Sequence, residues 1–127
     1  MRAEELKAVF DQLKPLLKKY EKGCIRARMD FESRYELWSE KEVEAFGKKR
    51  NEVYFSALII QSNYVGFYFM PIYADPEKMK KTIHPDLFKL LKGKSCFHIK
   101  KTDKELLCHI QQALAEGYSM YKDRDWV

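Results

Sequence analysis

Residues 25–37, IRARMDFESRYEL, decide the fold because apolar and charged side chains alternate along them almost without a break. One parity carries Ile25, Ala27, Met29, Phe31, Tyr35 and Leu37, and the other carries Arg26, Arg28, Asp30, Glu32, Arg34 and Glu36. Successive side chains of a strand point to opposite faces of its sheet, so the pattern predicts one buried and one solvated face. A solvated face of mixed charge is typical of antiparallel sheets. The stretch is long for one strand, and we expect a turn near residues 32–34 to divide it.

Helical periodicity appears on both sides of this stretch. Apolar residues recur at intervals of three and four from Leu6 to Tyr20, where Pro15 predicts a bend or a division of the helix. Residues 74–91 form a second helical pattern, which Pro85 interrupts. A third follows Thr102 and Glu105, which have capping-box spacing, and continues to residue 121.

Further strands are predicted in the middle of the chain. The runs VYFSALII (53–60) and YVGFYFMPIY (64–73) are rich in β-branched and aromatic residues, and QSN separates them as a hairpin turn would. Both parities of these runs are apolar, which favours central strands. SCFHIK (95–100) predicts a short strand, whereas the Ser39 and Glu42 spacing within the polar residues 39–52 predicts a short helix or turn.

These elements predict an α+β fold. We expect a two-layer sandwich in which an antiparallel sheet of about four to six strands packs against N-terminal, middle and C-terminal helices. The length of 127 residues predicts a single domain over residues 1–127, and the 46% share of apolar residues excludes a disordered chain.

Targeting and redox signals favour the cytoplasm. The amphipathic, acid-containing N-terminus does not resemble a signal peptide, and no apolar run approaches the ~20 residues that span a bilayer. The 3 cysteines lack a CxxC pair, which predicts free thiols in a reducing compartment. We therefore expect a cytoplasmic protein without membrane contact, either a monomer or a homodimer.

Positive charge is concentrated in one segment of the chain. The formal net charge is +5, and residues 78–101 alone carry eight lysines against the single acid Asp86. Such a stripe attracts phosphate, nucleic acid or an acidic protein, although a solvated lysine-rich face is the simpler interpretation. The candidate anion-binding residues are Lys80, Lys81, Lys89, Lys92, Lys94, Lys100 and Lys101.

Aromatic residues of the predicted central strands form a second candidate site. Tyrosines supply both an apolar ring and a polar hydroxyl, as ligand pockets require, although core packing is the alternative interpretation. Aromatic strands beside lysines are also typical of single-strand nucleic-acid platforms. The candidate pocket residues are Tyr54, Tyr64, Tyr68, Met70 and Tyr73.

Four features of the second half occur in a familiar order. They are YVGFY (64–68), LFKLLKGK (87–94), SCFHIK (95–100) and ELLCHIQQALAEGYSMY (105–121). Together they resemble the bacterial YdhG-like domains, a family of unknown function whose best-known member has been described as frataxin-like. The resemblance implies a small cytosolic α/β sandwich with an antiparallel sheet, and iron handling in some members.

Two sets of residues are candidate metal ligands. Frataxin-type iron binding uses exposed carboxylates, and here Glu40, Glu42 and Glu44 would supply them, although interleaved basic residues also fit a solvated loop. Cys96 and His98 share a strand face, and Cys108 and His109 could fold back near them as a tetrahedral zinc site. Buried structural cysteines are the alternative interpretation of that second set.

Catalytic motifs are missing from the sequence. There is no GxSxG and no glycine-rich phosphate loop. A Cys96–His109 dyad lacks an evident group that would stabilise the thiolate, and His84 before Pro85 is typical of a surface or cap residue. We therefore predict a non-catalytic binding or accessory module. Frataxin-like iron handling, with iron as the cofactor, and anion binding through residues 78–101 are the two alternatives.

Overall fold

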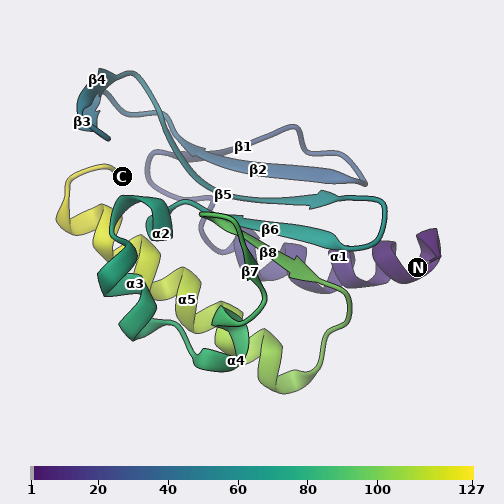
Figure 1. The fold of residues 1–127 in the computed structure, drawn as a ribbon. Helices are drawn as coiled ribbons and strands as arrows, with labels where there is room; N and C mark the ends of the chain where they lie inside the picture. The colour runs from purple at the N-terminus through teal and green to yellow at the C-terminus, as the bar shows by residue number, and fades with distance from the viewer. Residues whose placement is uncertain (1) are drawn as a thin grey trace.

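A computed structural model describes residues 2–127 and confirms the α+β prediction. Its main sheet has six strands in the order β1-β2-β5-β6-β8-β7, and every neighbouring pair is antiparallel (Figure 1). Two further strands, β3 and β4, form a separate hairpin. The strands are β1 (Ile25–Arg28), β2 (Arg34–Ser39), β3 (Val43–Ala45), β4 (Lys48–Arg50), β5 (Val53–Ile60), β6 (Val65–Phe69), β7 (Leu91–Lys92) and β8 (Cys96–Ile99).

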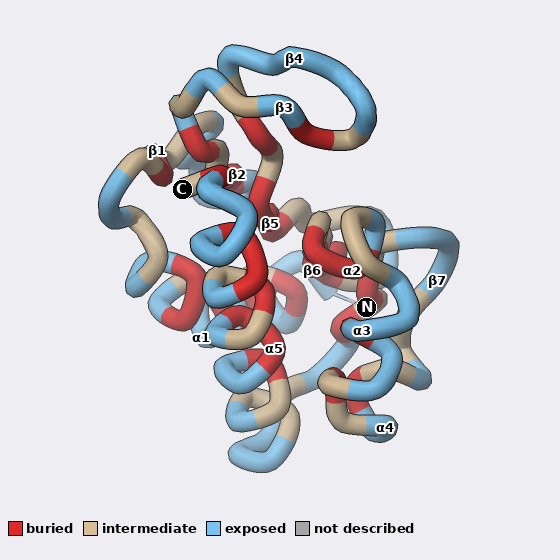
Figure 2. Tube along the Cα trace, turned by 90° about the vertical axis from the view of Figure 1, so that its left-hand side faces the viewer, coloured by how far each residue is buried: buried red, intermediate tan, exposed pale blue. Residues whose placement is uncertain are grey.

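The helices pack on one face of the main sheet, which makes the two layers of the sandwich (Figures 1 and 2). They are α1 (Ala3–Lys18), α2 (Pro71–Ala74), α3 (Pro76–Thr82), α4 (Pro85–Phe88) and α5 (Lys104–Asp123). α1 continues through Pro15 without dividing. The three short helices follow β6 and lie along α5. Among residues 2–127, no helix is long and apolar enough to cross a bilayer.

The alternating stretch forms two strands, as expected, but its turn comes earlier than predicted. Residues 29–33 connect β1 and β2, and Met29 adopts a positive φ of 53°. Tyr35 and Leu37 are fully buried, in agreement with the alternation. Met29 and Phe31 are 46% and 58% exposed, because they lie in the connection and no longer follow the pleat. The expectation that these two side chains join the buried face was therefore wrong.

The polar segment 39–52 forms the β3–β4 hairpin and not a helix or a simple turn. Phe46 and Gly47 at its tip both have positive φ, 52° and 77°, as a two-residue type I′ turn requires. The Phe46 ring packs against the rings of Tyr73 and Trp126, at centroid distances of 5.5 and 5.3 Å. Turn chemistry and one aromatic anchor thus outweigh the capping-box spacing of Ser39 and Glu42.

The two faces of the main sheet differ in chemistry. One face buries Leu58, Phe67 and Phe97 in register on neighbouring strands, beneath the apolar stripes of α1 and α5. Each such buried side chain contributes about 1.5–3 kcal/mol. The opposite face has no helix over it among the described residues. We call it the open face; it carries Trp38, Tyr54, Ala57, Gly66, Tyr68, Cys96 and His98.

The last helix begins one residue later than the capping-box pattern predicts. The Asp103 carboxylate accepts the backbone N–H of Leu106 at 2.8 Å, so Asp103 is the N-cap. Thr102 instead bonds Gln12 of α1 through its hydroxyl. Aspartate is a somewhat better N-cap than threonine, which accounts for the shift.

Gly117 of α5 offers a test of the packing between helix and sheet. A Cβ atom at this position would lie 2.5 Å from Cζ of Phe69 and 2.6 Å from Cγ of Pro71. We expect Gly117→Ala to lower the free energy of unfolding by about 1–3 kcal/mol, measured by urea denaturation, because overpacking outweighs the better helix propensity of alanine. Ser119→Ala, at an exposed position of the same helix, is the matched control and should not destabilise. A Gly117→Ala protein as stable as the control would contradict this packing.

Candidate functional site

A cavity of about 520 Å³ lies at the β7–β8 edge of the sheet, between α4 and the first turns of α5. Its size is within the range of small-molecule sites. The cavity is lined by Asp86, Lys89, Leu90, Lys92, His98, Lys100, Lys101, Asp103, Glu105, Leu106 and His109.

Two chain reversals bring these residues together. Gly93 has a φ of 73° and lies in the turn from β7 to β8, which returns the chain beside itself. The backbone N–H of His98 then bonds the carbonyl of Leu90 at 3.0 Å and closes the sheet edge. Beyond β8, Lys100 and Lys101 lead to the Asp103 cap, and α5 runs back alongside α4. The cavity wall is therefore made of residues that are near in sequence but come from four elements and their connections.

Among the described residues, three of the four lysines that line the cavity have no ion-pair partner. Asp86 pairs with the fourth, Lys89, at 4.0 Å, and one carboxylate oxygen of Asp103 accepts the Leu106 N–H that caps α5. Within residues 2–127, no carboxylate lies within 4.0 Å of the ammonium groups of Lys92, Lys100 or Lys101. Their charge remains available to an anionic ligand.

His98 connects the cavity with the open face. Its ring stacks on Tyr64 at a centroid distance of 3.6 Å and an interplanar angle of 11°. Desolvation, together with the positive charges of Lys92 and Lys100, lowers the pKa of His98 below its ordinary value of 6.5. These causes favour the neutral form of the imidazole, and a bound anion would raise its pKa.

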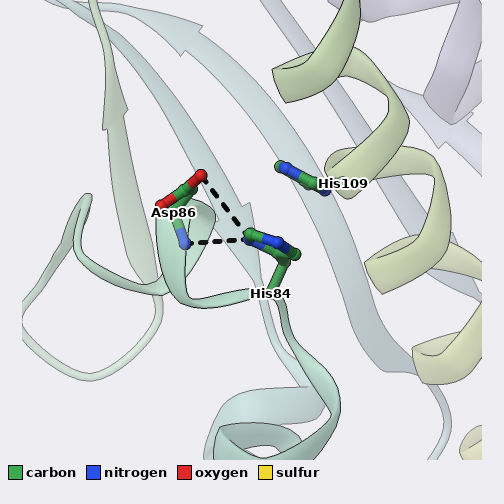
Figure 3. Close-up of side chains that lie close together, drawn as sticks. All are labelled: His84, Asp86 and His109. Atoms are coloured by element: carbon green, nitrogen blue, oxygen red, sulfur yellow. Dashed lines mark hydrogen bonds and ion pairs between the residues drawn. The ribbon is translucent and has the colours of Figure 1, made fainter.

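His84, Asp86 and His109 form a compact cluster beside the cavity (Figure 3). The imidazole rings of His84 and His109 stack at 3.7 Å with an interplanar angle of 10°. Nδ1 of His84 accepts the backbone N–H of Asp86 at 3.0 Å, so His84 caps α4, as its position before Pro85 predicted. In the described part of the chain, this is the only group of three or more His, Cys, Asp or Glu residues with potential ligand atoms within 4.8 Å of one another.

The structure distributes the predicted lysine stripe over three locations. Lys89, Lys92, Lys100 and Lys101 line the cavity. Lys80 and Lys81 are exposed on α3 and do not line the cavity. Lys94 lies over the ring of Tyr73, 5.8 Å from its centroid. Four of the seven predicted lysines thus share one site.

The predicted tyrosine pocket is not a single site. On the open face, Tyr54 stacks on Trp38 at 4.5 Å, and the Tyr68 ring lies over Gly66. Tyr64 lies beside His98. Met70 is the N-cap residue of α2, and the Tyr73 ring packs against Phe46 of the β3–β4 hairpin. Of the predicted set, the open face carries Tyr54 and Tyr68, with Tyr64 beside them on His98, whereas Tyr73 lies elsewhere.

The predicted acidic iron ligands lie around the β3–β4 hairpin and are partly engaged. Glu40 forms an ion pair with Arg28 at 2.9 Å, and Arg28 also binds Glu52. Glu42 and Glu44 flank Val43 at the start of β3. The ligand atoms of these three carboxylates do not all lie within 4.8 Å of one another, as those of His84, Asp86 and His109 do.

The predicted cysteine and histidine ligands are also distributed over different surfaces. Cys96 and His98 share the open face of β8, as predicted, whereas Cys108 is exposed on α5 and His109 faces the cavity. Burial raises the pKa of the Cys96 thiol, although a side-chain hydrogen bond with Tyr68 opposes the shift. The neutral thiol is thereby favoured, which disfavours both metal binding and nucleophilic attack.

Sequence reasoning missed the pairing of His84 and Asp86 with His109. The His-x-Asp spacing of residues 84–86 was a visible signal, since it places two ligand types at one helix start. Nothing in the sequence, however, indicated that His109 would lie against His84.

Comparisons with protein-family models, with curated proteins and with solved structures find no match for this chain. The resemblance to YdhG-like domains therefore stays a prediction. The function has to be argued from the cavity and the residues around it.

The lysines around His98 allow a direct test of the cavity electrostatics. We expect Lys92→Gln with Lys100→Gln to move the pKa of His98 upward, toward its ordinary value, because two positive neighbours of the imidazolium are removed. NMR titration of the imidazole resonances measures the shift. Lys94→Gln, on the same hairpin but over Tyr73, is the control and should leave the pKa of His98 unchanged. An unchanged pKa in the double variant would show that these lysines do not face the ring.

Proposed function

We propose that this protein is a non-catalytic binding module that holds a phosphate-bearing ligand in the cavity at the β7–β8 edge. The observation that carries the proposal is the convergence of Lys92, Lys100 and Lys101, without carboxylate partners in the described chain, on one cavity of about 520 Å³. Lysine ammonium groups bind phosphate as point charges, and three of them can surround one phosphate group.

The rest of the cavity indicates a ligand that is more than a bare ion. Leu90 and Leu106 contribute apolar surface to the lining, beside the imidazoles of His98 and His109. Small-molecule sites combine such apolar walls with a few charged groups that fix orientation. A phosphate attached to an apolar or aromatic group fits this division of the cavity.

Single-stranded nucleic acid is a second candidate, favoured by the neighbouring open face. Tyr64 and Tyr68 lie on this face beside His98, which also lines the cavity. Bases stack on such rings in sequence-tolerant binding, while lysines hold the phosphates. The open face and the cavity would then form one continuous binding surface for the nucleic acid.

Family membership, iron handling and cytoplasmic location are separate proposals that rest on the sequence. The resemblance to YdhG-like domains supports a cytosolic accessory role. The pairing of Glu40 with Arg28 gives the acidic iron site less support than the cavity has. An acidic protein partner for the lysine-rich segment is a further proposal that rests on its charge.

We expect Lys100→Gln with Lys101→Gln to weaken ligand binding about tenfold or more, measured by calorimetry at 50 mM salt. The probes are inorganic phosphate, a nucleoside monophosphate and a short oligothymidine. For the oligothymidine, the loss of two phosphate contacts should also reduce the slope of log affinity against log salt by about 1.4.

Lys80→Gln with Lys81→Gln is the matched control, since it removes the same charge from α3 outside the cavity. This variant should bind all probes as the original protein does. Binding of the oligothymidine alone would favour the nucleic-acid candidate. Absence of binding to every probe at low salt, or an equal loss in both double variants, would refute a specific phosphate site.

A further inference from the structure

We propose that His84, Asp86 and His109 bind a divalent transition-metal ion, for which Zn²⁺ is the probe, at the edge of the cavity. The proposal goes beyond anion binding and does not depend on it. It also concerns different residues from the acidic set around Glu40 and from the Cys96 and His98 pair.

Two helices of the fold, α4 and α5, bring the ligand atoms together. His84 precedes α4, Asp86 lies in its first turn, and His109 lies in the second turn of α5. One ligand atom of each residue lies within 4.8 Å of the other two. Figure 3 shows the carboxylate of Asp86 and the ring of His109 on either side of His84. The packing of α4 against α5 holds the three residues at this separation.

The donor set suits a particular class of metal. Two imidazole nitrogens and one carboxylate oxygen are the three protein ligands of many catalytic zinc sites and of two-His-one-carboxylate iron sites. Ca²⁺ and Mg²⁺ prefer oxygen ligands and would not select this cluster. Asp86 and His109 also line the cavity, so the remaining coordination positions would open toward it.

Metal binding requires a local rearrangement of the histidines. The nitrogen lone pairs lie in the ring planes, and two parallel rings stacked at 3.7 Å do not direct them to one point. Nδ1 of His84 also accepts the Asp86 N–H, which competes with its use as a ligand. Rotation of the two imidazoles out of the stack would make the lone pairs converge.

The surroundings of the cluster permit this rotation. The side chains of His84 and Asp86 are 40% and 60% exposed. Both belong to a helix of only four residues and its N-cap. His109, whose ring also has to rotate, is half-buried, so none of the three side chains is fully enclosed by the core.

The test is a calorimetric titration of metal-free protein with Zn²⁺ in a buffer without phosphate. We expect one equivalent to bind, and His109→Ala and His84→Ala each to weaken binding at least tenfold. Asp86→Asn, which keeps the shape of the side chain, should also weaken it. Thermal melting of each variant without metal checks that the fold is retained.

Matched controls distinguish this cluster from the other candidate ligands. Cys96→Ala and Cys108→Ala remove the thiol of the open face and the thiol beside His109, and both should bind Zn²⁺ as the original protein does. The absorption spectrum of the Co²⁺ form should show no thiolate charge-transfer band. Asp86→Asn keeps the backbone N–H that bonds His84, so we expect this variant to fold. It therefore still tests the site if a histidine variant fails to fold.

Several outcomes would overturn the assignment. No Zn²⁺ binding would refute the site, as would binding that survives all three substitutions in the cluster. Loss of binding in Cys96→Ala or Cys108→Ala would assign the metal to the cysteine and histidine set. Loss only on combined neutralisation of Glu40, Glu42 and Glu44 would assign it to the acidic residues. Phosphate binding is measured separately, so either proposal can fail alone.

Discussion

Phe55 is the side chain on which the packing of sheet and helices depends. The pairing of β2 with β5 slips between Leu37 and Trp38, so that Phe55 is an extra residue between the Leu37–Ser56 and Trp38–Tyr54 pairs. This bulge directs the Phe55 ring into the helical layer, where it is fully buried. The ring there meets those of Tyr20, Phe69, Tyr118 and Tyr121, at centroid distances of 5.3–6.3 Å. One bulged residue thereby joins the segment after α1, the central strands and α5.

The position of α5 determines the candidate site. Its C-terminal half is held against the sheet by the aromatic cluster and by the bond from the Tyr121 hydroxyl to the Tyr54 carbonyl at 2.7 Å. Its N-terminal half extends past the sheet edge, where it meets α4 and the residues that follow β8. The cavity therefore forms where the packing of α5 on the sheet ends and the short β7–β8 edge begins. A site at such an edge can admit a ligand without opening the core.

Anion and metal binding would meet at the same cavity with opposite electrostatic requirements. Lys92, Lys100 and Lys101 favour negative ligands, whereas Asp86 and the two histidines of the cluster favour a cation. A metal ion with open coordination positions would itself attract a phosphate, so the two ligands could bind together. The lysines would then hold the phosphate oxygens that the metal does not reach.

The sequence alone determined the fold class, because the alternation of residues 25–37 and the helical stripes are local consequences of side-chain direction. It also identified the lysine-rich segment, since charge is read directly from composition. The sequence did not predict the β3–β4 hairpin. Its type I′ turn at Phe46 and the contact of that ring with Trp126 cannot be recognised in a polar segment. Only the tertiary structure decided which lysines share a cavity and that His84 lies against His109. Those contacts depend on the turn at Gly93 and on the packing of α4 on α5, and such long-range geometry is not encoded in any short stretch of residues.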